Sequence, residues 1–118
     1  MTDTFTLVVN LWIRNQDIAA FEAFERKTAE LLQRHGGKID RAMRVADLHR
    51  NESSNTYDSP GDAPFEIHLV SFPNRAAFDA YRIDPEVVLL SAERERIILK
   101  TVTIEGYDSS SYFKYKGV

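Results

Sequence analysis

His68 is the residue in this chain whose type and surroundings are best suited to chemistry. It lies within the apolar run 64–72 (PFEIHLVSF), two positions after Glu66. Residues two apart in a strand share a face, so the Glu66 carboxylate can orient the imidazole. A histidine exchanges protons near neutral pH, and the pair therefore predicts an acid/base site. The alternative is a structural histidine, buried in a contact between subunits and hydrogen-bonded to a carboxylate.

Tyrosine and arginine side chains provide candidates for ligand binding. Tyr57 lies in the long polar segment 51–63, which we expect to form either the rim of a pocket or a solvated loop. Arg75, Arg94 and Arg96 could hold a carboxylate, because a guanidinium group binds it through two parallel hydrogen bonds. Glutamates stand close to the last two arginines, so ordinary pairing at the surface is the interpretation that we favour.

Several classes of site are absent from the sequence. There is no cysteine, which excludes disulfides, thiolate zinc sites and a cysteine nucleophile. The three histidines lie on separate segments and no glycine-rich phosphate loop is present, so we expect no metal and no cofactor. The net charge of −3, with acidic and basic residues interspersed, argues against a nucleic-acid partner. No apolar run approaches the roughly 18–20 residues of a membrane span, and the N-terminal run lacks the basic start of a signal peptide, so we expect no membrane partner and a cytoplasmic protein.

Hydrophobic periodicity predicts four strands and two helices in the order βαββαβ. The strands are expected at 4–14, 38–50, 64–72 and 97–107, and the helices at 17–35 and 74–95, the second interrupted at 83–84. Asp17, Asn74 and Asp84 are expected to cap helix N-termini, because their short side chains can accept from free backbone N–H groups. Gly36 and Gly37 are expected to end the first helix.

The alternation also predicts the face that each side chain takes. Odd-numbered residues from Phe5 to Ile13 are uniformly apolar and are expected to face the helices, whereas Asn10 and Trp12 lie on the mixed, opposite face. We further expect the core to contain Ile67, Leu69, Phe78, Val88, Val102 and Ile104, and a second subunit to be faced by Glu66, His68, Val70 and Phe72.

An antiparallel βαββαβ sheet with both helices on one face is the ferredoxin-like layout, and we expect one such α+β domain over residues 1–108. The opposite face would expose aromatic side chains to water, which monomers rarely do. We therefore expect a homodimer in which two sheets pack face to face. Residues 109–118 are expected to form a tail or an arm that contacts the other subunit.

The segment 72–108 carries a resemblance to known proteins. It contains an aromatic–proline pair, an alanine-rich helix with an aromatic residue, a turn that opens a further helix, and a last strand ending in glycine and tyrosine. These are, in order, Phe72-Pro73, residues 76–81, Asp84-Pro85-Glu86 and Gly106-Tyr107. The pattern resembles the dimeric α+β barrel superfamily, which includes antibiotic-biosynthesis-monooxygenase-like proteins. The resemblance implies the fold and the dimer but no single reaction, because the superfamily hosts several activities.

Cofactor-free monooxygenases of this superfamily bind aromatic compounds through asparagine, tryptophan, tyrosine and arginine. By that resemblance, the substrate-binding set would comprise Asn10, Trp12, Tyr81 and Arg82, with Tyr107 also shaping the pocket. Packing in an interface is the alternative role for Trp12. The haem-degrading members are a poorer match, since this chain has no tryptophan in 64–72 and no histidine in 74–95.

Three functions follow as hypotheses. The first is a homodimer that binds a small organic molecule between the sheet and the helices. The second is a cofactor-independent monooxygenase or isomerase acting on an aromatic or carbonyl compound, with His68 and Glu66 as catalytic residues. The third is a non-catalytic interaction module, in which those two side chains are sealed between the sheets.

Overall fold

The computed structural model describes residues 4–46, 50–51, 56–57 and 63–113, with the backbone alone for 50, 51, 56 and 57. Its elements are β1 (Phe5–Ile13), α1 (Ile18–Arg34), β2 (Lys38–Arg44), β3 (Arg50–Asn51), β4 (Thr56–Tyr57), β5 (Glu66–Phe72), α2 (Arg75–Arg82), α3 (Pro85–Leu89), α4 (Ser91–Ile97), β6 (Ile98–Tyr107) and the short 3₁₀ helix η2 (Ser110–Tyr112). Within these ranges, no helix combines the length and the apolar character that a membrane crossing requires. The C-terminal part of the expected tail, 114–118, and most of the expected loop 51–63 lie outside the described residues.

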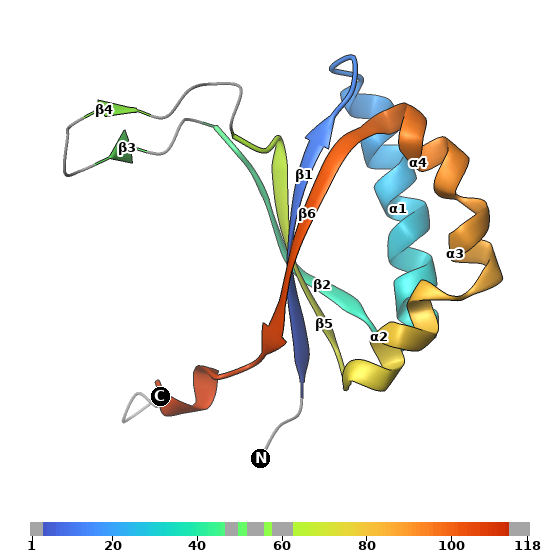
Figure 1. Ribbon diagram of the computed structural model, residues 1–118, viewed down its shortest axis with the longest axis vertical. Helices are drawn as coiled ribbons and strands as arrows, with labels where there is room; N and C mark the ends of the chain where they lie inside the picture. The colour runs from blue at the N-terminus through green and yellow to red at the C-terminus, as the bar shows by residue number, and fades with distance from the viewer. Residues whose placement is uncertain (1–3, 47–49, 52–55, 58–62, 114–118) are drawn as a thin grey trace.

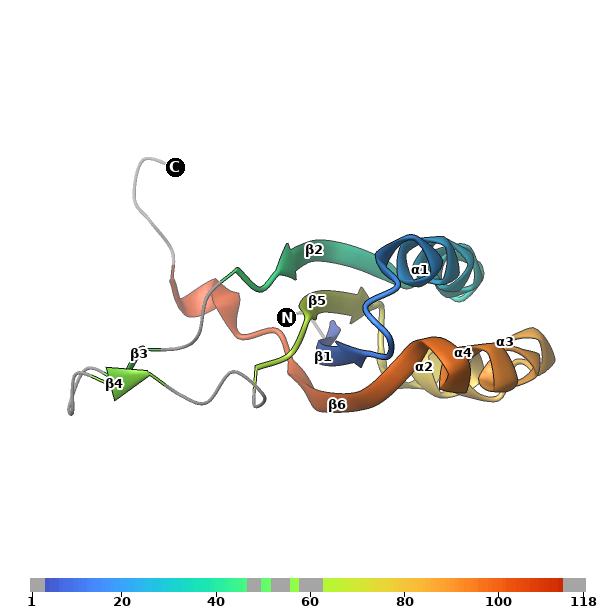
Figure 2. The ribbon, with the colours of Figure 1, turned by 90° about the horizontal axis from the view of Figure 1, so that it is seen from above.

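Four strands form one antiparallel sheet in the order β2-β5-β1-β6, and β3 pairs with β4 in a separate two-stranded ribbon. Helices α1 to α4 all lie on one side of the four-stranded sheet (Figure 1). Seen from above, α1 lies toward the β2 edge and α4 toward the β6 edge (Figure 2). This is the ferredoxin-like α+β arrangement, and the prediction of the fold is confirmed.

Helices α1, α2 and α3 begin where the local chemistry predicts, and α1 also ends there. The break at Leu90 that separates α3 from α4 was not predicted, and α4 begins without a side-chain cap. Asp17 Oδ1 accepts from Ala20 N at 3.0 Å, and the side chains of Asn74 and Asp84 cap α2 and α3 in the same way. Gly36 ends α1 with a φ of +77°, a left-handed conformation that a residue with a Cβ adopts only under strain. The N–H groups of Gly36 and Gly37 then bond the last free carbonyls of the helix.

The face assignment is confirmed for β1 and wrong for β5 and β6. Phe5, Leu7, Leu11 and Ile13 are buried under the helices. On β5, however, the side chains that share this covered face are Glu66, His68, Val70 and Phe72, and all four are buried. The pairing explains the reversal, because directly opposite residues of antiparallel strands share a face. The register places Phe5 opposite Phe72 and Val9 opposite His68.

The same register moves the apolar residues of β6 to the uncovered face. Val102 and Ile104 lie opposite Asn10 and Val8, and they are 40% and 61% exposed rather than in the core. Val88 on α3 was also expected in the core and is 55% exposed, whereas Phe78 is buried as expected. Thr101 and Thr103 take the covered face instead. The uncovered face therefore carries a broad apolar surface, which we call the outer face: Val8, Trp12, Met43, Ile67, Leu69, Val102 and Ile104.

The buried core consists of two clusters. One gathers around Phe5, Phe72 and Phe78, and the other around Phe21 and Phe24. Val9 packs against both. The functional features described below lie between these clusters, where polar side chains replace apolar ones.

Candidate functional site

A cavity of about 340 Å³ lies between the sheet and the helices. Residues of both core clusters line it, which gives it apolar walls. Its polar lining consists of Glu25, Thr28, His68, Tyr81, Arg82, Arg94, Thr101 and Thr103. A small cavity with apolar walls and a few convergent polar groups is typical of a site for a small molecule.

A larger hollow of about 690 Å³ lies near the C-terminal end of β6 and opens more widely. Its charged side chains, Lys38, Asp40 and Asp108, are all exposed. Exposed charged groups are solvated, and hydrogen bonds from Ser110 in the same turn stabilise the ionised Asp108 carboxylate and lower its pKa. We therefore assign the candidate site to the smaller cavity.

His68 is held between two carboxylates. Its Nε2 lies 2.5 Å from Glu66 Oε2, and its Nδ1 lies 3.4 Å from Glu25 Oε1. The residue is only 4% exposed. The imidazole is thus fixed at both nitrogens and links Glu66 to Glu25.

Arg44 on β2 positions Glu66. Its Nε and Nη2 atoms both approach Glu66 Oε1, at 2.8 and 2.7 Å, which leaves Oε2 for His68. Arg44 also bonds Glu22 at 3.0 Å and covers the Phe65 ring. Because the Glu66 carboxylate accepts from Arg44 on one oxygen, it accepts from His68 Nε2–H on the other. The other ring nitrogen, Nδ1, faces Glu25 Oε1.

Glu25 is the unusual member of this group. Its Oε2 is buried and has no hydrogen-bond partner among the described residues. Burial raises the pKa of the Glu25 carboxyl above its ordinary value of 4.5, and the charges of His68 and Arg94 oppose this rise. A buried polar atom without a partner is rare in folded proteins. This one lines the cavity, where a bound molecule can supply the missing partner.

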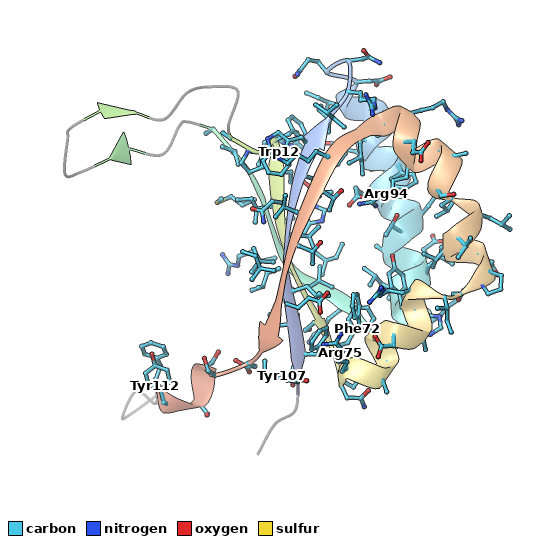
Figure 3. All side chains as sticks on the ribbon, in the orientation of Figure 1. Trp12, Phe72, Arg75, Arg94, Tyr107 and Tyr112 are labelled. Carbon is cyan, nitrogen blue, oxygen red and sulfur yellow. The ribbon has the colours of Figure 1, made fainter. Side chains whose placement is uncertain are left out.

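Arg94 and Tyr81 add hydrogen-bond donors to the wall of the cavity. Arg94 Nη2 donates to Thr101 Oγ1 at 2.6 Å, and Figure 3 shows Arg94 in the space between the sheet and the helices. Burial raises the pKa of the Tyr81 hydroxyl to about 12, so this group remains a donor at physiological pH. Its ring packs against Phe72 and His35.

The residues expected from the sequence to bind substrate separate into two groups. His68, Tyr81 and Arg82 line the cavity, and Glu66 adjoins it through His68. Asn10 and Trp12 lie on the opposite side of the sheet. There Asn10 Nδ2 donates to Val102 O at 3.0 Å, and the Trp12 ring lies under the Lys100 ammonium group. Figure 3 shows Trp12 on the sheet.

Two further expected residues lie away from the cavity. Tyr107 is 61% exposed and packs edge-on against Phe5, at the end of β6. The backbone of Tyr57 belongs to β4, and its side chain lies outside the described part of the chain. Tyr107 therefore does not join the group around His68, and the expectation for the Tyr57 side chain stays a prediction.

Sequence reasoning missed Glu25 and misjudged Arg94. Glu25 follows Phe21 by four positions and precedes Thr28 by three, so it lies within the inward stripe of α1. A charged residue inside an otherwise apolar stripe is the signal that could have identified it. Arg94 was expected to pair with neighbouring glutamates, but its side chain donates instead to the hydroxyl of Thr101 on β6.

Comparison with known proteins supports the fold. No protein-family model matches the chain, and no curated protein matches it significantly. A DABB family protein with a ferredoxin-like fold from Mesorhizobium loti is 15% identical, covers 89% of this chain and 96% of its own, and has a TM-score of 0.63. A protein of unknown function from Rhodopseudomonas palustris is 16% identical over 92% and 84% of the two chains, with a TM-score of 0.68. SnoaB, a cofactor-independent oxygenase from Streptomyces nogalater, is 15% identical over 91% and 94%, with a TM-score of 0.61.

The chain has the fold of these proteins. The ferredoxin-like fold that the resemblance implies is therefore confirmed. At 14–16% identity the likeness carries no assignment of activity. The chemistry of this chain has to be argued from its own side chains.

A second hollow of about 370 Å³ reaches the same residues from the other side of α1. Glu25 and His68 line both cavities, whereas Arg44 and Glu66 line the second alone. The Glu25–His68–Glu66–Arg44 chain thus connects the first cavity to a more open surface. Among the described residues, no group of three or more histidine, aspartate or glutamate side chains is placed to hold a metal ion.

Proposed function

We propose that the protein binds a small organic molecule in the 340 Å³ cavity and transfers a proton on it, with Glu25 as the base and His68 as its partner. The observation that carries the proposal is the buried Glu25 Oε2, which lines the cavity and has no partner among the described residues. The reaction class that fits is isomerisation of a carbonyl or aromatic compound through an enolate or phenolate.

The environment of Glu25 suits a general base. A carboxylate whose pKa is raised abstracts protons more effectively than an ordinary one, because base strength follows pKa. Burial supplies that rise here. In the proposed step Oε2 takes the proton from a C–H beside a carbonyl, the electron pair stays on the ligand as an enolate, and Glu25 returns the proton to another carbon.

His68 and Glu66 support this step. The Glu66 carboxylate fixes the imidazole through Nε2, so that Nδ1 faces Glu25. His68 can then share the proton that Glu25 has taken. The second cavity exposes the same pair to a more open surface, which offers a route for exchange of that proton with water.

The position of His68 argues against the non-catalytic module. That hypothesis predicts His68 and Glu66 sealed between the sheets of two subunits. Both face the helices instead, and His68 lines two cavities. Buried ionisable groups beside a cavity are characteristic of functional sites.

We also propose that the protein is a homodimer, in which the outer face of one sheet packs on that of a second copy. The support is the exposure of Met43, Leu69, Val102 and Ile104 on one side of the sheet. A contiguous apolar surface of this kind is usually covered by a partner. Since the cavity lies on the other side of the sheet, this dimer would leave the cavity open.

Proton abstraction can be tested with 2-tetralone, a small neutral ketone with acidic C–H groups. Exchange of its α-hydrogens in D₂O is followed by NMR with and without the protein. We expect the wild-type protein to accelerate exchange, and Glu25→Gln to lose on the order of 10²-fold or more of that acceleration. Glu22→Gln is the matched control, because Glu22 lies on the same helix, is exposed and pairs with Arg44. Exchange no faster than in buffer, or equal in wild type and Glu25→Gln, would refute the proposal.

A further inference from the structure

We infer that the molecule bound in the cavity is an organic anion, and that Arg94 holds its carboxylate. This inference rests on the proposed function in one respect, namely that the cavity of about 340 Å³ takes up a ligand. It adds the chemical class of that ligand and the residue that selects it.

Arg94 lines the cavity and forms no ion pair, whereas the other described cations without an ion pair, such as Arg26 and Arg96, do not line it. Arg34, Arg44 and Arg75 each form an ion pair with a carboxylate. Arg94 forms none among the described residues, and its side chain donates one hydrogen bond, to the neutral hydroxyl of Thr101. A guanidinium group has five N–H donors. Most of its donors are therefore available to a molecule in the cavity.

Within the cavity, the charges of Glu25 and Arg94 interact, but the two side chains form no direct ion pair. Glu25 is the carboxyl group in the lining, but its Oε1 faces His68 and it is not within ion-pair distance of Arg94. The second cation, Arg82, lies near Asp79 at 4.0 Å and over the Phe78 ring. A half-buried charge without a direct ion pair is unfavourable, and a bound anion removes that cost.

The remainder of the lining predicts the shape of the anion. Leu7, Val9, Leu32, Val70 and Phe72 provide an apolar surface for a hydrocarbon or aromatic body. The guanidinium group and the Tyr81 hydroxyl provide donors for a carboxylate, and a planar guanidinium binds it through two parallel hydrogen bonds. The size of the cavity, at the lower end of the range for small-molecule sites, excludes large ligands. The structure thus favours a small carboxylic acid with an apolar body.

Two probes of nearly equal size and different charge test this inference. Binding of 2-naphthoate and of neutral 2-naphthamide is measured by calorimetry, and their place of binding by NMR shifts of cavity residues. We expect 2-naphthoate to bind about 10–100-fold more tightly, which is the range for a hydrogen bond to a charged group. Arg94→Met should remove this preference, and Arg94→Lys should keep part of it, because lysine retains the charge without the two parallel donors.

Arg96→Met serves as the control, because Arg96 lies on the same helix, is exposed and does not line the cavity. Thermal unfolding of each variant shows that it is folded before its affinity is interpreted. If both probes bind in the cavity with equal affinity, or if Arg94→Met retains the preference for 2-naphthoate, the inference about the anion is refuted and the binding cavity stands. If neither probe binds there, both the inference and the proposed ligand site are refuted.

Discussion

Replacing Glu25 by glutamine should make the protein more stable at neutral pH and leave its stability almost unchanged at pH 4. Glutamine has nearly the same shape as glutamate but never ionises. In the wild-type protein, burial disfavours the ionised carboxylate and raises the pKa of Glu25. Ionisation therefore costs the folded protein free energy that the variant does not lose.

The sign and the upper limit of the effect follow from the linkage between protonation and folding. Glu25 has an ordinary pKa of 4.5 and a higher one in the folded protein. The stabilisation by the neutral form is fully present below pH 4.5 and is lost as the pH rises through the folded pKa. Because one proton is involved, the loss cannot exceed about 1.4 kcal/mol per pH unit. The gain of the variant over wild type should grow over this window and become constant above it.

Urea unfolding of both proteins between pH 4 and pH 8, at one protein concentration, measures this difference. The concentration is kept constant because an assembly of subunits would add a concentration-dependent contribution. Glu22→Gln is the control, since Glu22 is exposed and pairs with Arg44; its curve should not show the same growth with pH. A free energy of unfolding for Glu25→Gln that runs parallel to wild type at every pH would show that burial does not penalise the charge of Glu25.

Two further substitutions test the packing around the site and the outer face. Gly37→Ala would place a Cβ 2.6 Å from the ring of Phe72, which lines the cavity, so we expect a loss of about 1–3 kcal/mol of stability from overpacking. Gly106→Ala is the control and should be tolerated, because its Cβ would meet no atom within 4 Å. Equal effects of the two substitutions in urea unfolding would contradict this expectation. Leu69→Lys should shift sedimentation from dimer to monomer, because it places a charge on the outer face, whereas Leu89→Lys, at a position on α3 that is 78% exposed, should leave the dimer intact. A wild-type protein that is monomeric at micromolar concentration would refute the dimer.

The fold was predictable because its local signals agree with one another. The caps at Asp17, Asn74 and Asp84 and the glycines after α1 mark the ends of the helices in the sequence itself. The alternation of β1 is equally clear, because one of its faces is entirely apolar. β2 was expected to reach residue 50 and ends at Arg44. Because β2 mixes apolar and charged residues, its sequence shows no clear alternation of the two faces. A shift in its pairing with β5, between Ile39 and Arg41, also interrupts the alternation in the structure.

The face of β5 was not predictable from its own residues. Its alternation offers one face with Ile67 and Leu69 and another with Glu66 and His68, and hydrophobicity alone assigns the first to the core. The partner strand decides otherwise, since β1 pairs in a register that aligns His68 with Val9. Phe72 and Val70, on the same face as His68, fill the core beside the Phe78 ring. Burying these two apolar side chains therefore carries Glu66 and His68 under the helices with them.

The residues whose position contradicts the hydrophobic pattern are the residues of the candidate site. A chain selected for stability alone would place apolar residues at the positions of Glu25 and His68, because an unpartnered buried carboxyl oxygen is costly. Natural proteins depart from such rules mainly where function requires it. Here the departure is shared by two elements, α1 and β5, whose inward faces bring Glu25 and His68 together beside a cavity. The hydrophobic pattern thus fails at the positions where a proton-transfer site requires ionisable side chains. Burying them lowers the stability of the protein, and Glu25→Gln should recover that stability.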